Sequence, residues 1–343
     1  NAQYGGCRNF YIADNVIIGR EDSTRTHGRT SVWAEYGPVA DLSSFIGVDI
    51  SGQGHVVCHN YIANFHDAID ITEQGPPERE DWKVVSIDFY NNDIHNTTDD
   101  FIEADCGVHN IRVFNNRGFN SAHHGLSAQP IYGGPAYFIR NIVYHVPPGG
   151  AFKFNLYPSG VLVYHNTLCS EWSSNPPYSN IHVRNNLFLG IDFPKRLILN
   201  ASTYTSYTTF DYNGYRYNKN SEDQFKWISP GKGTLTDYTL KENTLSGSFK
   251  TLEEFSAATG QERHGKIVDY DIFTSVTIPD WTYPPRIYCP EQCDFSLRPD
   301  TPAVDSGCIL PNINDGFSGK APDLGALEIG QPAPVFGPRG NMP

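Results

Sequence analysis

The sequence predicts an all-β solenoid, a parallel β-helix, and a recurring asparagine is the main reason. Apolar residues stand three positions before each of these asparagines, and an apolar residue or glycine stands two positions after. The later intervals are 24, 25, 25 and 20 residues, which is the length of a solenoid repeat. The repeats alternate apolar and polar residues and show no helical period, so strands build them. The asparagines are Asn15, Asn60, Asn92, Asn116, Asn141, Asn166 and Asn186.

The physics of stacking explains the column of asparagines. Coils of a β-helix stack ~4.8 Å apart and pair their strands in parallel, so equivalent residues form columns. An asparagine in such a column can hydrogen-bond the asparagines above and below, and it tolerates the left-handed backbone of a tight corner. Asparagine is also a common turn residue in β-sandwiches, but seven returns in one register favour the solenoid.

Along the chain, residues 1–215 carry the predicted coils, and insertions at residues 19–45 and 73–83 interrupt the early ones. Long loops on a solenoid usually cluster on one side and wall a binding groove. Residues 216–343 form a less regular C-terminal extension that we expect to pack on the same solenoid. Within it, the capping box Thr251-Leu-Glu-Glu254 predicts a short helix that ends near Gly260.

Composition restricts the classes of function. The 343 residues can bury a large core, and the repeat favours one elongated domain. We expect a cap or further coils before the first strand, because an uncovered strand edge would promote aggregation. A formal charge of −13 argues against a nucleic-acid partner, which needs a basic surface, and no apolar run approaches membrane-spanning length. Cys289 and Cys293 are predicted to form a local disulfide, and Cys58 is predicted to be a small core residue. These features favour a secreted or periplasmic protein.

A second strand follows each asparagine turn, and four of these strands align. The aligned segments are Asp67–Thr72, Asp100–Asp105, His124–Gln129 and Gly150–Asn155. Their third and fifth residues are apolar and are expected to face inward: Ile69, Ile71, Ile102, Ala104, Leu126, Ala128, Phe152 and Phe154. Alternation then turns the fourth and sixth residues outward. The two outward columns are Asp70, Glu103, Ser127, Lys153 and Thr72, Asp105, Gln129, Asn155.

These columns crowd acidic side chains onto neighbouring coils. Stacked carboxylates repel, so at least one should hold its proton above the usual pKa unless a cation intervenes. Paired carboxylates can cleave a glycosidic bond, one as general acid and the other as nucleophile or base. The candidates for this pair are Asp70, Asp100, Glu103 and Asp105, with His124 to orient or assist.

Two alternatives stay open for the same cluster. Asp70, Glu103 and Asp105 could instead hold Ca²⁺, the candidate cofactor, which would acidify a uronic acid while Lys153 abstracts its proton. The charges could also be purely structural, on a solvated polar face.

Aromatic residues supply candidates for sugar binding. The chain has 20 Tyr, 20 Phe and 5 Trp, and apolar sugar faces stack on such rings, although many of these rings are ordinary core residues. The predicted platforms are Trp33, Trp82 and Tyr132, and the further candidate substrate contacts are His123, Gln129 and Arg140.

The asparagine column and two tail segments, Phe295–Gly307 and Ala321–Gly330, resemble secreted bacterial right-handed parallel β-helix proteins, among them polysaccharide lyases and glycoside hydrolases. Asp99-Asp100 and His124-Gly125 are similar to motifs on successive coils of polygalacturonase-type hydrolases. The Arg-x-Lys of that family does not follow His124; the nearest candidates are Arg140 and Lys153. The resemblance implies a right-handed β-helix that acts on a polysaccharide.

The leading prediction is therefore a glycoside hydrolase that acts on a polysaccharide or oligosaccharide by paired-carboxylate catalysis. One alternative is a Ca²⁺-dependent polysaccharide lyase with Lys153 as the base. A non-catalytic glycan-binding or adhesion solenoid is the other. An oligomer is compatible with the sequence, because β-helix enzymes sometimes build sites between protomers.

Overall fold

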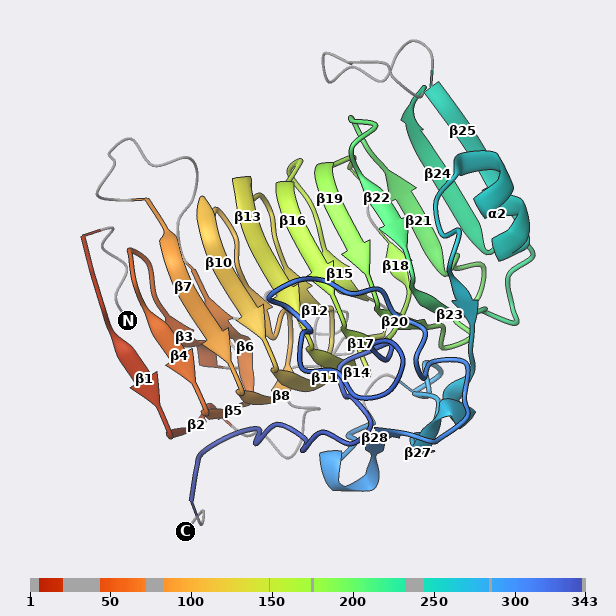
Figure 1. Ribbon diagram of the computed structural model, residues 1–343. Coiled ribbons are helices and arrows are strands. Elements are labelled where there is room, and N and C mark those ends of the chain that lie inside the picture. The colour runs from red at the N-terminus through yellow and green to blue at the C-terminus, as the bar shows by residue number, and fades with distance from the viewer. Residues whose placement is uncertain are drawn as a thin grey trace.

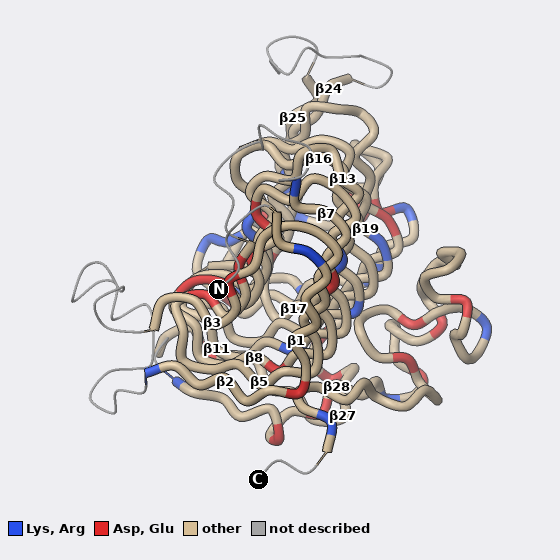
Figure 2. The backbone as a smooth tube through the Cα atoms, turned by 90° about the vertical axis from the view of Figure 1, so that its left-hand side faces the viewer, with Lys and Arg blue, Asp and Glu red and all other residues tan. Residues whose placement is uncertain are grey.

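The computed structural model describes residues 6–20, 44–71, 83–147, 149–173, 176–231, 244–283 and 286–340. Its strands form long parallel sheets that wind into a solenoid, so the predicted parallel β-helix is confirmed (Figure 1). Figure 2 looks along the axis from the N-terminal end, where the stacked coils lie one behind another. Among the described residues, no helix has the length and apolarity needed to cross a membrane.

Two sheets meet at the asparagine corner, and each coil contributes one strand to each sheet. The first sheet contains β1 (Tyr11–Ala13), β4 (Val56–Cys58), β7 (Val85–Tyr90), β10 (His109–Phe114), β13 (Tyr132–Ile139), β16 (Ser159–Tyr164), β19 (Ser179–Arg184) and β22 (Thr209–Asp211). The second contains β2 (Val16–Ile18), β5 (Tyr61–Ala63), β8 (Asp93–Thr97), β11 (Arg117–Ser121), β14 (Ile142–Tyr144), β17 (Thr167–Cys169), β20 (Leu187–Leu189), β23 (Gly214–Arg216) and β26 (Lys266–Ile267).

A third face completes the coil. Its first sheet has the order β15 (Gly150–Lys153), β12 (His124–Ser127), β9 (Ile102–Glu103), β6 (Phe65–Asp70) and β3 (Ser44–Asp49). The next sheet, which begins beside β15, has the order β18 (Trp172–Ser173), β21 (Leu199–Ser202), β24 (Phe225–Pro230) and β25 (Thr244–Phe249). Because β24 pairs in parallel with β21, the coiling continues beyond residue 215.

The interior of the coil is apolar, and stacked aromatic rings fill it toward the C-terminal end. Phe152 and Phe154 stack with ring centroids 5.0 Å apart, and both contact the buried ring of Trp172. Cys58 is buried in the coil, as predicted.

The asparagine column is a continuous hydrogen-bonded ladder at the corner between the first two sheets. Each side-chain amide donates to the carbonyl oxygen of the next asparagine at 2.8–3.0 Å, and that oxygen also accepts from a backbone amide. The ladder runs one rung beyond the prediction, to Asn213, and ends on the carboxylate of Glu262. The expectation of a left-handed asparagine is wrong by one position, because the positive φ falls on the preceding residue, such as His59 or Arg140.

After residue 250, a helix closes the end of the coil, where Leu252 and Phe255 join the interior core, and most of the later chain packs on the outside of the coil (Figures 1 and 2). The predicted helix is α2 (Leu252–Thr259), with Thr251 and Glu254 forming the capping box and Gly260 in the left-handed conformation. The 3₁₀ turns Tyr270–Ile272 and Pro290–Gln292 and the antiparallel pair β27 (Phe273–Ser275) and β28 (Asp294–Leu297) follow. The disulfide expected between Cys289 and Cys293 is not formed, and both are free thiols.

The final segment runs back along the ladder corner toward the first coil. It contacts the left-handed corner residues in turn, from the late coils to the early ones. The contacts pair Cys308 with Asn185, Ala326 with Arg140, Gly337 with Asn91 and Arg339 with Asp14.

Candidate active site

The third face carries the outward column that the sequence predicts. Across the parallel strands, Asp70 lies opposite Glu103, Glu103 opposite Ser127, and Ser127 opposite Lys153. The buried residues one position earlier, from Ile69 to Phe152, pair in the same way, so the predicted register is confirmed. Asp49 of β3, which lies opposite Asp70, extends the column by one further carboxylate.

Lys153 lies at the centre of the charged groups. Its Nζ donates to Asp100 Oδ2 at 2.6 Å and to Glu103 Oε1 at 3.0 Å, and lies 3.7 Å from Asp99 Oδ1. Burial, the largest influence, would lower the pKa of Lys153, but the carboxylates of Asp100, Asp99 and Glu103 outweigh it and hold the pKa above its usual range. The lysine is therefore a buried counter-ion for the acidic groups.

Four carboxyl groups converge here, and three of them lie within 4.0 Å of this ammonium. Oxygens of Asp67, Asp99, Asp100 and Glu103 lie within 4.8 Å of one another. Burial raises the pKa of Asp67 well above its usual range, and the charges of Glu103 and Asp99 add to it. Burial and Asp99 likewise raise the pKa of Asp100, whose side chain is fully buried. For Asp99, burial acts in the same direction, but a hydrogen bond with His123 and the charge of Lys153 hold the pKa below its usual range.

Asp105 stands two residues after Glu103, in the turn that follows β9. Its Oδ1 accepts hydrogen bonds from Ser127 Oγ at 2.6 Å and from the backbone amide of Gln129 at 2.8 Å. Burial and the nearby charge of Glu103 raise the pKa of Asp105 to about 7 despite these hydrogen bonds and Lys153. A carboxyl group in this position is part protonated and part ionised at neutral pH.

Histidines line one side of the cluster. His123 Nδ1 lies 2.8 Å from Asp99 Oδ1 and 3.1 Å from His124 Nδ1, and His124 Nδ1 lies 4.0 Å from Asp100 Oδ1. Burial, then the charges of His123 and Lys153, lower the pKa of His124 to about 3, so its ring is neutral at physiological pH. His66 Nε2 lies 3.8 Å from Asp67 Oδ2 and 4.0 Å from Asp99 Oδ2.

The structure brings most of the predicted catalytic residues together, but not all of the predicted substrate contacts. Gln129 lies at the cluster through its amide, whereas Tyr132 Oη donates to Cys106 Sγ at 3.9 Å. Trp33 and Trp82 lie outside the described residues.

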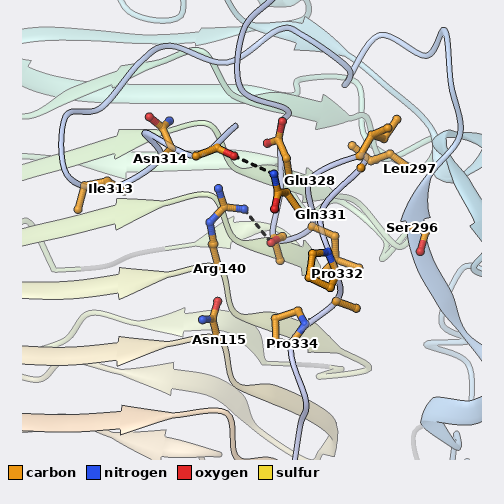
Figure 3. Close-up of a pocket in the computed structure, with 16 residues that line it drawn as sticks. Asn115, Arg140, Ser296, Leu297, Ile313, Asn314, Glu328, Gln331, Pro332 and Pro334 are labelled. Atoms are coloured by element: carbon orange, nitrogen blue, oxygen red, sulfur yellow. Dashed lines mark hydrogen bonds between the residues drawn. The ribbon is translucent and has the colours of Figure 1, made fainter. Parts of the chain in front are cut away.

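Arg140 does not join the cluster. It belongs to the corner between β13 and β14, where its guanidinium donates to the Ala326 carbonyl at 3.1 Å (Figure 3). There it lines a cavity of about 450 Å³ beneath the final segment of the chain, together with Asn115 and Glu328. Arg140 was predicted at the site because it is the nearest arginine after His124. Spacing along the chain does not reveal which corner of a coil a residue occupies, and this prediction is wrong.

Three residues of this face were not singled out from the sequence. Phe45, Asp49 and His66 come from β3 and β6 at the early end of the sheet. The Phe45 ring is 53% exposed and stacks on His66 with centroids 5.0 Å apart. The alternation of Ser44–Asp49 is the sequence signal for this strand, but the insertion predicted at residues 19–45 overlaps its start.

Among the described residues, the groups of side chains that could hold a metal ion differ from the predicted Ca²⁺ set. Glu103 groups with Asp67, Asp99 and Asp100 rather than with Asp70 and Asp105, and a second group contains Asp99, His123 and His124. Three carboxylates of the first group, Asp99, Asp100 and Glu103, already pair with the Lys153 ammonium, which neutralises them as a bound cation would.

Comparison with known protein families found no matching family model, and comparison with curated proteins found no match. The fold and the site define a parallel β-helix protein whose outer face carries a lysine-neutralised carboxylate cluster.

Proposed function

We propose that the protein is a glycoside hydrolase that cleaves a polysaccharide, with Asp105 as the proton donor and Glu103 as its ionised partner. The observation that carries this proposal is the contrast between two neighbouring carboxyl groups. Glu103 accepts a hydrogen bond from the Lys153 ammonium, whereas Asp105 accepts from a hydroxyl and a backbone amide. Glycosidic cleavage uses such a pair, one group protonated and the other ionised.

The proton donor must carry its proton at neutral pH. Burial raises the pKa of Asp105 to about 7, which meets that condition. Both of its hydrogen bonds from described residues reach Oδ1, so Oδ2 can carry the proton. In the proposed reaction Asp105 gives this proton to the glycosidic oxygen as the bond to the anomeric carbon breaks.

Glu103 completes the reaction at the anomeric carbon. Its carboxylate either attacks that carbon or takes a proton from the water that attacks it. Carboxyl groups about 5 Å apart give retention and those about 6.5–9.5 Å apart give inversion. The anomeric configuration of the first product distinguishes the two routes.

Exposed aromatic rings at both ends of the sheet support an extended sugar chain as the substrate. Phe45 stands on β3 at one end, and Tyr157, 57% exposed, follows β15 at the other. The carboxyl groups lie on the strands between them. Apolar sugar faces stack on such rings, so both rings are candidate contacts for a sugar chain that crosses the strands.

Elimination by a lyase is less well supported by the geometry. A lysine base must be neutral to accept a proton, and three carboxylates hold Lys153 in its charged form. A Ca²⁺ ion at Asp100 and Glu103 would also have to displace the Lys153 ammonium.

The test is a polysaccharide panel incubated with the purified chain, with and without EDTA. Hydrolysis releases reducing ends without new near-ultraviolet absorbance, and EDTA should not abolish it. Absorbance from an unsaturated product, lost with EDTA, would establish the lyase instead. Glycan binding without cleavage of any substrate would favour the non-catalytic binding module. Full activity of a Glu103→Gln, Asp105→Asn double variant would remove the catalytic assignment.

A further inference from the structure

Beside the carboxyl pair, three side chains direct ligand atoms at one another. Asp99 and His123 occupy equivalent turns of successive coils, 24 residues apart, and His124 follows directly. Asp99 Oδ1 and His124 Nδ1 lie 2.8 and 3.1 Å from the same atom, His123 Nδ1. The His123 side chain is half exposed, so this group is open to solvent on one side.

These short contacts are poorly satisfied by protons alone. An imidazole nitrogen carries at most one hydrogen. A hydrogen on His123 Nδ1 would have to be shared between the Asp99 carboxylate and the His124 nitrogen. By contrast, atoms bound tetrahedrally to one Zn²⁺ ion at about 2.1 Å lie roughly 3.4 Å from one another, so a small opening of these contacts would admit the ion.

A second observation points to the same place. Asp100 Oδ1 is fully buried and accepts no hydrogen bond from any described residue. It lies 4.0 Å from His124 Nδ1. A buried carboxylate oxygen without a donor is costly, and an ion or an ion-bound water at such a position is a usual explanation.

We propose that Asp99, His123 and His124 bind a divalent transition-metal ion, with Zn²⁺ as the best match. Two imidazole nitrogens and one carboxylate oxygen are a donor set that suits Zn²⁺, whereas Ca²⁺ takes oxygen ligands. A water on the ion would fill the open coordination position and donate to Asp100 Oδ1.

The surrounding charges are compatible with a bound cation. Lys153 Nζ, 3.7 Å from Asp99 Oδ1, opposes it, but Asp100 and Glu103 neutralise this ammonium directly. Asp67 adds a further carboxyl group beside Asp99. The metal proposal does not depend on glycosidic cleavage, because its ligands are distinct from Glu103 and Asp105.

The experiment is a titration of the chelator-treated full chain with Zn²⁺ by calorimetry, repeated with Ca²⁺. We expect one Zn²⁺ per chain and no comparable binding of Ca²⁺. Changing a group that merely orients a ligand weakens metal affinity about 10- to 100-fold, so the loss of the ligand in His123→Ala should weaken Zn²⁺ binding by about 100-fold or more. The control is His109→Ala, an exposed histidine at the start of β10, which should bind Zn²⁺ unchanged.

Circular dichroism shows whether each variant folds, and His124→Gln replaces His123→Ala if the latter does not. Co²⁺ gives a second readout, since visible absorption bands typical of nitrogen and oxygen ligands should form in the wild type and be lost in the variant. Absence of Zn²⁺ binding, equal binding by the ligand variant, or preferential binding of Ca²⁺ would each overturn the proposal. None of these results affects the reducing-end assay, so the two proposals fail separately.

Discussion

The ladder corner and the acidic face are built by the same stacking of coils, yet their chemistry is opposite. At the corner, each asparagine offers a donor to one neighbour and an acceptor to the other, so the inner rungs are satisfied and neutral. On the third face, carboxyl groups meet carboxyl groups, and one lysine provides the compensation. Stacking identical polar side chains therefore stabilises the fold only when each one can donate a hydrogen bond to one neighbour and accept one from the other.

This contrast separates a structural column from a functional one. Replacing an amide in the ladder should cost stability and leave chemistry untouched. Replacing a carboxyl group on the acidic face should cost chemistry, because like charges placed together do not stabilise the fold.

The largest expected effect is on catalysis. Glu103→Gln and Asp105→Asn should each reduce hydrolysis of the identified polysaccharide by about 100- to 10,000-fold, the usual contribution of a positioned acid or base. Asp105→Asn keeps shape and removes a charge, so its unfolding midpoint should not fall. Glu103→Gln removes one of the two carboxylates bonded to Lys153, but Asp100 keeps the other bond, and circular dichroism checks that this variant folds. Glu291→Gln, an exposed carboxylate of the C-terminal region, is the matched control and should retain full activity.

The second effect concerns the counter-ion. Lys153→Met leaves Asp100 and Glu103 without their ammonium, and removing one partner of a buried ion pair costs about 3–5 kcal/mol. Urea unfolding at neutral pH measures this loss. Lys250→Met breaks a pair with Glu222 that is exposed on both sides, and no measurable change is expected there. Equal stability of the two variants would mean that the acidic face does not need its lysine.

The third effect is in the ladder. Asn116→Ala removes the acceptor of two hydrogen bonds from Asn92 and leaves a buried backbone amide unsatisfied. We expect a loss of about 3 kcal/mol in the free energy of unfolding. The exposed end rung Asn15→Ala should lose much less, because water can replace its partners. Similar losses at both rungs would contradict the importance of burial.

The last effect is a pH dependence shared by the two regions. Burial raises the pKa of Asp105 on the acidic face and of Glu262 at the ladder end to about 7 in each case. The unfolded chain releases these protons near pH 4, so between about pH 4 and about pH 7 the folded state binds more protons. Stability should therefore fall as pH rises through this window.

Unfolding midpoints at about pH 5 and about pH 8 test this dependence. Asp105→Asn and Glu262→Gln should each reduce the difference between the two midpoints, while Glu291→Gln should leave it unchanged. An unaltered difference in both buried-carboxyl variants would show that these groups titrate normally.

Much of the fold was predictable because solenoid stacking turns sequence spacing into spatial neighbours. The frame around the asparagines located the ladder, and alternation placed Glu103 beside Asp70 and Ser127. The capping box located α2 for an equally local reason.

The turn residues could not be placed in the same way. Asp99 and His66 lie at or beside corners, where alternation of inward and outward side chains is interrupted. Glu262 reaches the end of the ladder from 49 residues beyond Asn213, outside any repeat. The reach of Lys153 across an intervening strand to Glu103 depends on the side-chain conformation, which spacing does not encode.

The path of the Lys153 side chain to Glu103 makes the small size of Ser127 important. It occupies the strand between Glu103 and Lys153, and its short side chain turns aside to Asp105. The smallness of this one residue opens a passage through which the ammonium extends over a neighbouring strand. A bulkier residue there would close the passage and leave lysine and glutamate on either side of a barrier.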